Sequence, residues 1–148
     1  MLRRAVDALL SRAQQAEVVA AIGAAEARTS GEIKVHVETR CRGGDPLARA
    51  QALIQRLGLD RTPHRNGVLL YVAVRDRKFA VVGDVAVHDR ASQALWDQVA
   101  SELRAHFARG AYREGLLSAV KHVGDALAAH FPAEPGSRHR VSDQITGR

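Results

Sequence analysis

Carboxylates gather with hydroxyl and amide side chains around the beginnings and ends of apolar runs in one part of this sequence. These residues are Thr29, Ser30, Glu32, Asn66, Asp84, His88 and Asp89. Oxygen ligands of this kind suit a hard cation such as Ca²⁺ or Mg²⁺. A bound cation would also remove the repulsion between neighbouring carboxylates. The candidate metal ligands are therefore Thr29, Glu32, Asp84 and Asp89.

A second group combines acids with arginines: Glu38, Arg40, Asp45, Arg75, Asp76 and Arg77. Here Arg75 and Arg77 could bind an anion such as phosphate, with Asp76 as nucleophile or metal ligand. Simpler roles stay open for both groups. Thr29 can help to end a helix, Glu32 can pair with a surface arginine, and an aspartate such as Asp76 is common in turns.

The other reactive side chains carry weaker signals. No two histidines on a predicted helix are four residues apart, so the helix-borne metal pattern is missing. We expect His36 on the solvent-facing side of a strand, and we retain only His88 as a functional candidate. Cys41 has no obvious histidine partner for nucleophilic catalysis.

The elements that must position these residues follow from the hydrophobic pattern. Helical spacing, or a capping signal, predicts helices at 11–27, 46–57, 91–107 and 112–131. Strict alternation at 32–39 predicts a strand with one wet face, at or near a sheet edge. The continuous apolar run 68–74 is typical of a central strand, and 78–83 follows it after a short turn. The segment 133–148 is polar and is predicted to be a mobile tail.

The order of these elements fixes which acids can meet. A strand, a helix and a strand at 32–74 form a right-handed βαβ unit with parallel strands, and the strand at 78–83 returns antiparallel. Glu32 and Asp84 then lie at one end of the sheet. Asp76 lies at the opposite end, about 20 Å away at about 3.3 Å per residue. One site cannot use both ends, and the sequence leaves open which end carries it.

Length and composition place the chain among ordinary globular domains. It has 148 residues, of which 46% are hydrophobic and 26% charged, and it contains one cysteine. A disulfide framework and a thiolate zinc site are excluded. No run approaches the roughly 20 apolar residues of a membrane helix. The formal net charge of +6 invites a nucleic-acid partner, but few aromatics are present to stack on bases, so we do not expect one.

Two segments resemble the TPM domain family, the thylakoid-lumen phosphatase-like group. They are Glu26-Ala27-Arg28-Thr29-Ser30-Gly31-Glu32-Ile33 and Arg65-Asn66-Gly67-Val68-Leu69-Leu70-Tyr71-Val72, the latter continuing through Asp76-Arg77-Lys78-Phe79 to Gly83-Asp84. The resemblance implies a three-layer α/β/α fold with a small mixed, Rossmann-like sheet. It also implies that some relatives are acid phosphatases, that some bind divalent cations, and that some maintain membrane complexes. No glycine-rich dinucleotide motif or P-loop is present, so no dinucleotide is expected.

Two functions follow as expectations for a domain at 11–132, preceded by a lead-in at 1–10. The first is a module that binds a divalent cation, Ca²⁺ or Mg²⁺, and a protein partner. The alternative is a metal-assisted phosphomonoesterase of low efficiency, which the absence of a paired nucleophile and base makes the weaker interpretation. The N-terminus lacks the uninterrupted apolar segment of a signal peptide because Asp7 breaks it, so we expect a cytoplasmic location.

Overall fold

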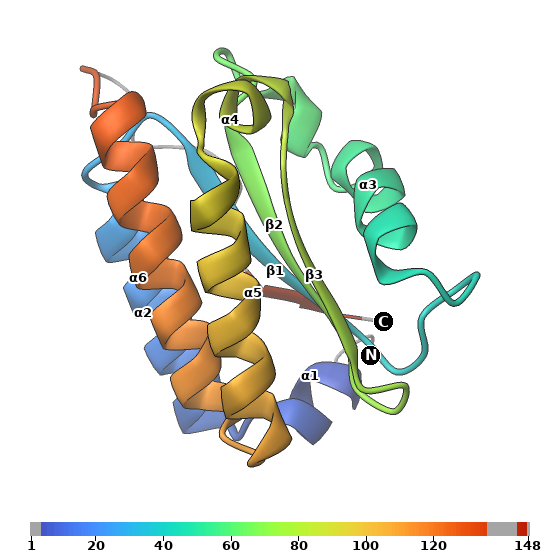
Figure 1. The fold of residues 1–148 in the computed structure, drawn as a ribbon. Coiled ribbons are helices and arrows are strands. Elements are labelled where there is room, and N and C mark those ends of the chain that lie inside the picture. The colour runs from blue at the N-terminus through green and yellow to red at the C-terminus, as the bar shows by residue number, and fades with distance from the viewer. Residues whose placement is uncertain (1–3, 136–144, 148) are drawn as a thin grey trace.

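The computed structural model describes residues 4–135 and 145–147, and its centre is a four-stranded mixed sheet (Figure 1). The strands lie in the order β3-β2-β1-β4. Their bounds are β1 Glu32–Glu38, β2 Gly67–Ala73, β3 Lys78–Gly83 and β4 Ile145–Gly147.

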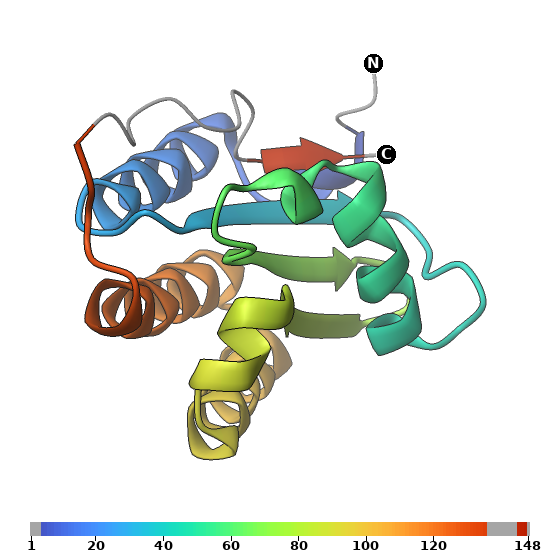
Figure 2. The same ribbon diagram turned by 90° about the horizontal axis from the view of Figure 1, so that it is seen from above.

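Helices cover both faces of this sheet. The helical elements are α1 Arg4–Leu9, α2 Arg12–Glu26, α3 Pro46–Arg56, the 3₁₀ turn η1 Leu59–Arg61, α4 Val85–Arg90, α5 Gln93–Ala108 and α6 Tyr112–His130. Helix α3 lies on one face, and α2, α5 and α6 lie on the other, as Figure 1 and Figure 2 show. The predicted three-layer α/β/α class with a small mixed sheet is therefore confirmed.

The strand directions predicted from the βαβ unit are also confirmed. Strands β1 and β2 are parallel, with Glu32 opposite Gly67. Strands β2 and β3 are antiparallel, with Val68 opposite Gly83. The backbone N–H of Asp84 then donates to the Gly67 carbonyl at 2.8 Å. Glu32, Gly67 and Asp84 therefore meet at one end of the sheet.

Side-chain caps begin three of the predicted helices, and at α5 the cap is Ser92, whose hydroxyl accepts from the Leu95 backbone N–H. Ser11 and Gln14 form the reciprocal capping box expected at the start of α2. At α3, the Asp45 carboxylate accepts hydrogen bonds from the backbone N–H groups of Leu47 and Ala48. Asp45, assigned to the second acidic group from sequence, therefore serves as a helix cap.

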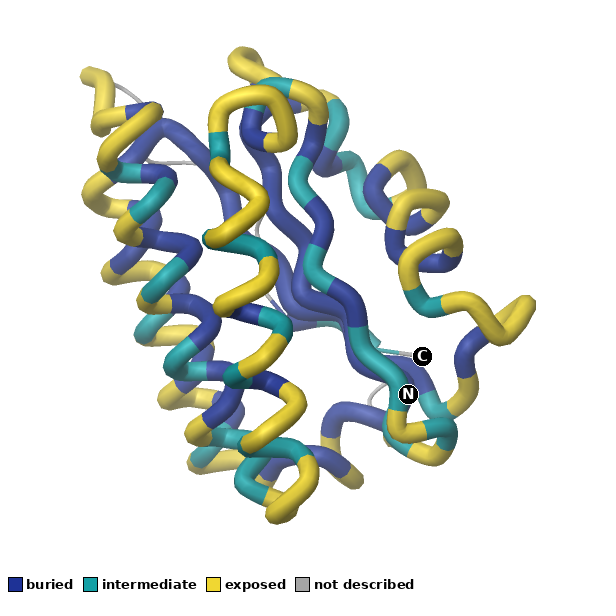
Figure 3. Tube along the Cα trace, in the orientation of Figure 1, coloured by how far each residue is buried: buried dark blue, intermediate teal, exposed yellow. Residues whose placement is uncertain are grey.

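Strand β1 lies next to the edge strand β4, near the edge as predicted, but the predicted wet face is wrong. All seven residues of β1 are buried (Figure 3), because β4 pairs with its outer edge and Arg49 of α3 lies over Glu38 on its polar face. His36 is thus not solvent-facing: its Nδ1 lies 2.7 Å from the Thr146 hydroxyl of β4. The polar side chains of β1 are therefore covered by other parts of the protein and not by water.

Four further elements were not predicted, one of them the 3₁₀ turn η1 that follows α3. Helix α1 lies within the expected lead-in 1–10, and α4 precedes the helix predicted at 91–107. Strand β4 lies within the stretch expected to be a polar tail, whose residues 136–144 and 148 fall outside the described part of the chain.

The central strand β2 divides the apolar side chains between two cores. Leu70 joins the larger core under α2, α5 and α6. Its neighbour Leu69 joins the smaller core under α3. Within the described residues, no helix combines the length and the apolar character that crossing a membrane requires.

Candidate functional site

An acidic groove of about 410 Å³ lies where β3 ends and α4 begins. Helix α3 and the turn η1 form its other wall. Its lining residues are Gln51, Ile54, Gln55, Asp60, Arg65, Gly83, Asp84, Val85, His88 and Asp89. The groove thus contains Asp84, Asp89 and His88 from the first predicted group, and it adds Asp60 and Arg65.

Arg65 holds the buried carboxylate of Asp84 in a two-pronged ion pair. Its Nε donates to Asp84 Oδ2 at 2.6 Å, and its Nη2 donates to Oδ1 at 2.9 Å. The Asp84 side chain is 5% exposed, whereas that of Arg65 is 48% exposed. The hydrogen bonds to Asp84 raise the pKa of Arg65. Arg65 is therefore the counter-charge of Asp84, and it reaches that carboxylate from the solvent side.

Two features of the backbone bring this pair together. The antiparallel hairpin places Asp84 beside Gly67, so the loop before β2 runs along the end of β3. Arg65 itself has a φ of +51°, in the left-handed region that non-glycine residues rarely adopt.

Asp60 supplies a carboxylate oxygen with unmet bonding capacity. Its Oδ1 is buried and accepts no hydrogen bond from any described residue. The charge of Asp60 also acts on Arg65, whose pKa it helps to raise. A buried carboxylate oxygen without a donor is unfavourable unless positive charge lies close by, and in this groove the Arg65 guanidinium supplies such a charge.

The carboxylates do not form a ready-made chelate. Across residues 4–135 and 145–147, no three His, Cys, Asp or Glu side chains lie in an arrangement that could hold a metal ion. The Arg65 guanidinium occupies the oxygens of Asp84. A cation would have to take its place for Asp84 to become a ligand.

The rest of the first predicted group lies outside the groove lining. The Thr29 hydroxyl donates to backbone carbonyls at the end of α6, those of Leu127, at 3.1 Å, and of Phe131. Asn66 Nδ2 donates to the Ser30 hydroxyl at 3.1 Å. Glu32 is buried at the beginning of β1. These contacts join the loop before β1 to its neighbours.

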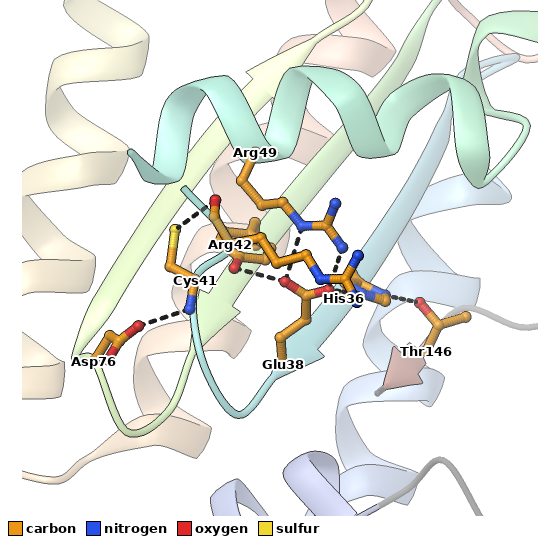
Figure 4. Close-up of polar contacts among 8 residues, drawn as sticks. His36, Glu38, Cys41, Arg42, Arg49, Asp76 and Thr146 are labelled. Carbon is orange, nitrogen blue, oxygen red and sulfur yellow. Dashed lines mark hydrogen bonds and ion pairs between the residues drawn. The ribbon is translucent and has the colours of Figure 1, made fainter. Parts of the chain in front are cut away.

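The second predicted group separates into several local contacts. Asp76 Oδ1 accepts from Arg40 Nη1 at 2.9 Å. Its Oδ2 accepts from the Cys41 backbone N–H at 2.7 Å, as Figure 4 shows. The hydrogen bond from Cys41, followed by that from Arg40, lowers the pKa of Asp76. Arg75 is exposed, and Arg77 lines a different cavity beside Lys78 and Phe79.

Glu38 belongs to a buried polar network that the sequence analysis missed. Arg49 from α3 donates to both of its oxygens, Nε to Oε1 at 3.0 Å and Nη2 to Oε2 at 2.5 Å (Figure 4). The Tyr71 hydroxyl donates to Oε1 at 2.8 Å. Burial alone would raise the pKa of Glu38, but these hydrogen bonds prevail and lower it to about 2. Burial lowers the pKa of the adjacent His36.

Sequence signals for the missed residues were indirect. Arg49 is next to Ala50 on the buried side of α3. A charge at such a position needs a buried acid as its partner, and Glu38 of β1 is that acid. The sequence could place Arg65 near Asp84 only if the β2–β3 pairing were followed from the hairpin turn to the far end, where Val68 lies opposite Gly83. Asp60 carries no local motif.

The comparisons with known proteins agree with this architecture. The model of the TPM domain matches residues 5–126. No curated protein matches the chain. Among solved structures, the BA42 protein from the psychrophilic bacterium Bizionia argentinensis is 34% identical, with a TM-score of 0.83, over 93% of this chain and 94% of that one.

Two more distant structures share the fold. The N-terminal domain of the cg2496 protein from Corynebacterium glutamicum is 18% identical with a TM-score of 0.64, over 90% of this chain and 79% of that one. An N-terminal domain from P. gingivalis is 24% identical with a TM-score of 0.67, over 83% of this chain and 79% of that one. By the family match across most of its length, this chain belongs to the TPM domain family.

Proposed function

We propose that this chain is a binding module that takes up a divalent cation, Ca²⁺ or Mg²⁺, in the acidic groove and also binds a protein partner. The main observation in favour of a cation site is the buried Oδ1 of Asp60, which has no hydrogen-bond donor among the described residues. Asp60 lines the same groove as Asp84 and Asp89.

The chemistry of the groove supports a hard ion. Carboxylate and amide oxygens are the ligands that Ca²⁺ and Mg²⁺ prefer, and the lining provides both, with Gln51 and Gln55 on α3. A divalent ion carries twice the charge of the Arg65 guanidinium and would compensate Asp60 and Asp84 together. Because the Arg65 side chain is half exposed, it has solvent to move into when the ion binds.

The contacts around Asp76 support binding rather than hydrolysis. A nucleophilic carboxylate needs an oxygen free to attack, but both oxygens of Asp76 accept hydrogen bonds that hold the turn in place. Asp76 also does not line the cavity that Arg77 lines. The phosphomonoesterase alternative therefore has less geometric support than the binding module.

A calcium and magnesium titration followed by amide NMR shifts tests the proposal. We expect millimolar Ca²⁺ or Mg²⁺ to shift amides of residues 60–66 and 83–90. Asp84→Asn and Asp60→Asn should each weaken the response. Asp125→Asn is the matched control, because Asp125 is a surface carboxylate paired with Arg28 at 2.8 Å and far from the groove in sequence; it should titrate like the unsubstituted chain.

Two results would overturn the cation site. One is the absence of shifts at millimolar Ca²⁺ and Mg²⁺. The other is a set of shifts confined to residues 38–45 and 75–77, which would move the site to the opposite end of the sheet. Turnover of a phosphate ester that requires Mg²⁺ and disappears in Asp76→Asn would replace the binding module with the enzyme.

A further inference from the structure

Strand β3 has one edge that no described strand covers. The sheet order ends at β3, which pairs only with β2. Figure 1 shows it as the outermost strand, with α5 on one side and α3 on the other. An uncovered strand edge is a template for pairing with another extended chain.

The hydrogen-bond register shows which backbone groups face outward. The bond from the Asp84 N–H to the Gly67 carbonyl makes these two residues a hydrogen-bonded pair. Antiparallel pairs alternate between bonded and non-bonded, so the N–H and C=O groups of Phe79 and Val81 point away from β2. No hydrogen bond joins these outward groups to another residue within the described ranges.

An open groove of about 530 Å³ runs along this edge. Pro46 and Leu47 at the beginning of α3 form one wall, and Trp96 and Ala100 of α5 belong to the other. Leu47 is 49% exposed, which is unusual for a large apolar side chain in this protein. The volume lies within the range of about 300–1,000 Å³ that is typical of ligand sites.

One end of the groove is strongly cationic. Arg77, Lys78 and Arg104 line it where the β2–β3 hairpin turns. The Arg104 guanidinium lies 5.8 Å from the centre of the Phe79 ring. Arg77 has a φ of +54°, and a non-glycine residue held in this region marks backbone strain that often accompanies a functional site. An occupant of the groove therefore meets three positive charges at this end, against one negative charge in the lining, that of Asp97.

The middle of β3 lacks the features that usually protect an edge. Residues 79–83 contain neither a proline nor a charged side chain. Lys78 stands only at the beginning of the strand, where its Nζ donates to the Gly44 carbonyl at 2.5 Å.

We propose that the outer edge of β3 binds an extended, acidic segment of a partner protein by β-strand addition. The partner backbone would exchange hydrogen bonds with Phe79 and Val81, and its apolar side chains would lie between Leu47 and Trp96. Its carboxylates would meet Arg77 and Arg104. Main-chain bonds supply affinity in this mode, and side-chain pockets supply specificity. The inference rests on the partner half of the proposed function and is independent of the cation.

The test uses two labelled synthetic peptides, Asp-Asp-Thr-Val-Thr-Val-Thr and its reverse, because strand addition can be parallel or antiparallel. We expect at least one to bind, as measured by fluorescence anisotropy. Its binding should shift the amides of Phe79 and Val81 and slow their exchange with solvent. Val81→Pro removes one outward N–H without removing a bond to β2, and should abolish binding.

A charge reversal that leaves the strand intact keeps the test decisive if Val81→Pro does not fold. Arg77→Glu combined with Arg104→Glu should weaken binding at least about tenfold. The control is Arg109→Glu, an exposed arginine that follows α5 outside the groove lining; it should bind like the unsubstituted chain.

Several outcomes would overturn this inference. They are no binding of either peptide, shifts that avoid β3, equal affinity in the charge-reversed and control variants, or pairing of two copies through β3 seen as a dimer by sedimentation. Measurements with EDTA and with Ca²⁺ separate the two proposals. If the unsubstituted chain responds to Ca²⁺ but binds neither peptide, the strand-addition site is contradicted. If it binds a peptide but does not respond to Ca²⁺, the acidic groove is contradicted as a cation site.

Discussion

At the scale of single residues, the Glu38 carboxylate is a buried charge held by several hydrogen bonds. It is 2% exposed and bonded to Arg49 and Tyr71. Removing one partner from such a pair typically costs about 3–5 kcal/mol, because the remaining charge stays buried and uncompensated. The sequence analysis placed Glu38 in the second group, with Asp76 and the neighbouring arginines. Its contacts make it a link between β1, β2 and α3.

The lowered pKa of Glu38 predicts a specific dependence of stability on pH. Its pKa falls from 4.5 to about 2 on folding, so its contribution is complete above pH 4.5 and is lost as pH falls toward 2. Between pH 6 and pH 3 the loss from this one group should be about 2 kcal/mol.

Urea unfolding of the unsubstituted chain and of Glu38→Gln at both pH values measures this contribution. The glutamine side chain of the variant cannot titrate, so the variant should be less stable at pH 6 and should lose less stability on acidification. An equal loss in both proteins would show that Glu38 does not carry the acid sensitivity.

At the scale of elements, the close contact of α2 and α6 depends on one glycine. The two helices run side by side in Figure 1 and Figure 2. A Cβ added at Gly124 of α6 would lie 2.8 Å from the Ala25 Cβ of α2, closer than such atoms approach. Gly23, on the exposed side of α2, has no such neighbour: a Cβ there would meet nothing within 4 Å.

This contrast predicts opposite effects for the same substitution. Gly124→Ala should force the helices apart and lower the free energy of unfolding by about 1–3 kcal/mol. Gly23→Ala should raise it by about 0.5–1 kcal/mol, because alanine favours the helix. Chemical denaturation of both variants checks the pair. Destabilisation by Gly23→Ala, or stabilisation by Gly124→Ala, would contradict the packing of α2 on α6.

At the scale of the whole molecule, local patterns predicted the elements better than the contacts between distant ones. The apolar run 68–74 marked the central strand, and Ser11 with Gln14 marked a helix start, because each signal lies within a few residues. Strand β4 could not be predicted because its pairing with β1 joins segments more than 100 residues apart. The alternating pattern of β1 predicted a wet face because the contacts of His36 with Thr146 and of Glu38 with Arg49 also join distant segments.

The same distinction applies to the candidate site. Sequence reasoning placed Asp84 at the same end of the sheet as Glu32, as the structure does, because strand direction alone decides it. It did not find Asp60 or Arg65, since their approach to Asp84 depends on hairpin register and on the turn η1. The ion pairs Arg49–Glu38 and Arg65–Asp84 each join two different elements. Hydrophobic periodicity predicts single helices and strands, so it does not show such pairs.

Cation binding to the acidic groove should be visible in the stability of the entire fold, since a ligand that binds only the folded state raises Tm. The central measurement is thermal unfolding of the unsubstituted chain, Arg65→Ala and Asp84→Asn, with EDTA or with Ca²⁺. At a calcium concentration about ten times Kd, a domain of this size should gain roughly 2–5 °C.

Arg65→Ala should have the lowest Tm in EDTA and the largest gain with Ca²⁺, because the ion no longer competes with the guanidinium for Asp84. Asp84→Asn should gain little. Arg28→Ala, which removes the surface partner of Asp125, should gain as much as the unsubstituted chain. If Arg65→Ala gains no more than Arg28→Ala, the groove does not exchange its arginine for a cation, and the account of this site is wrong.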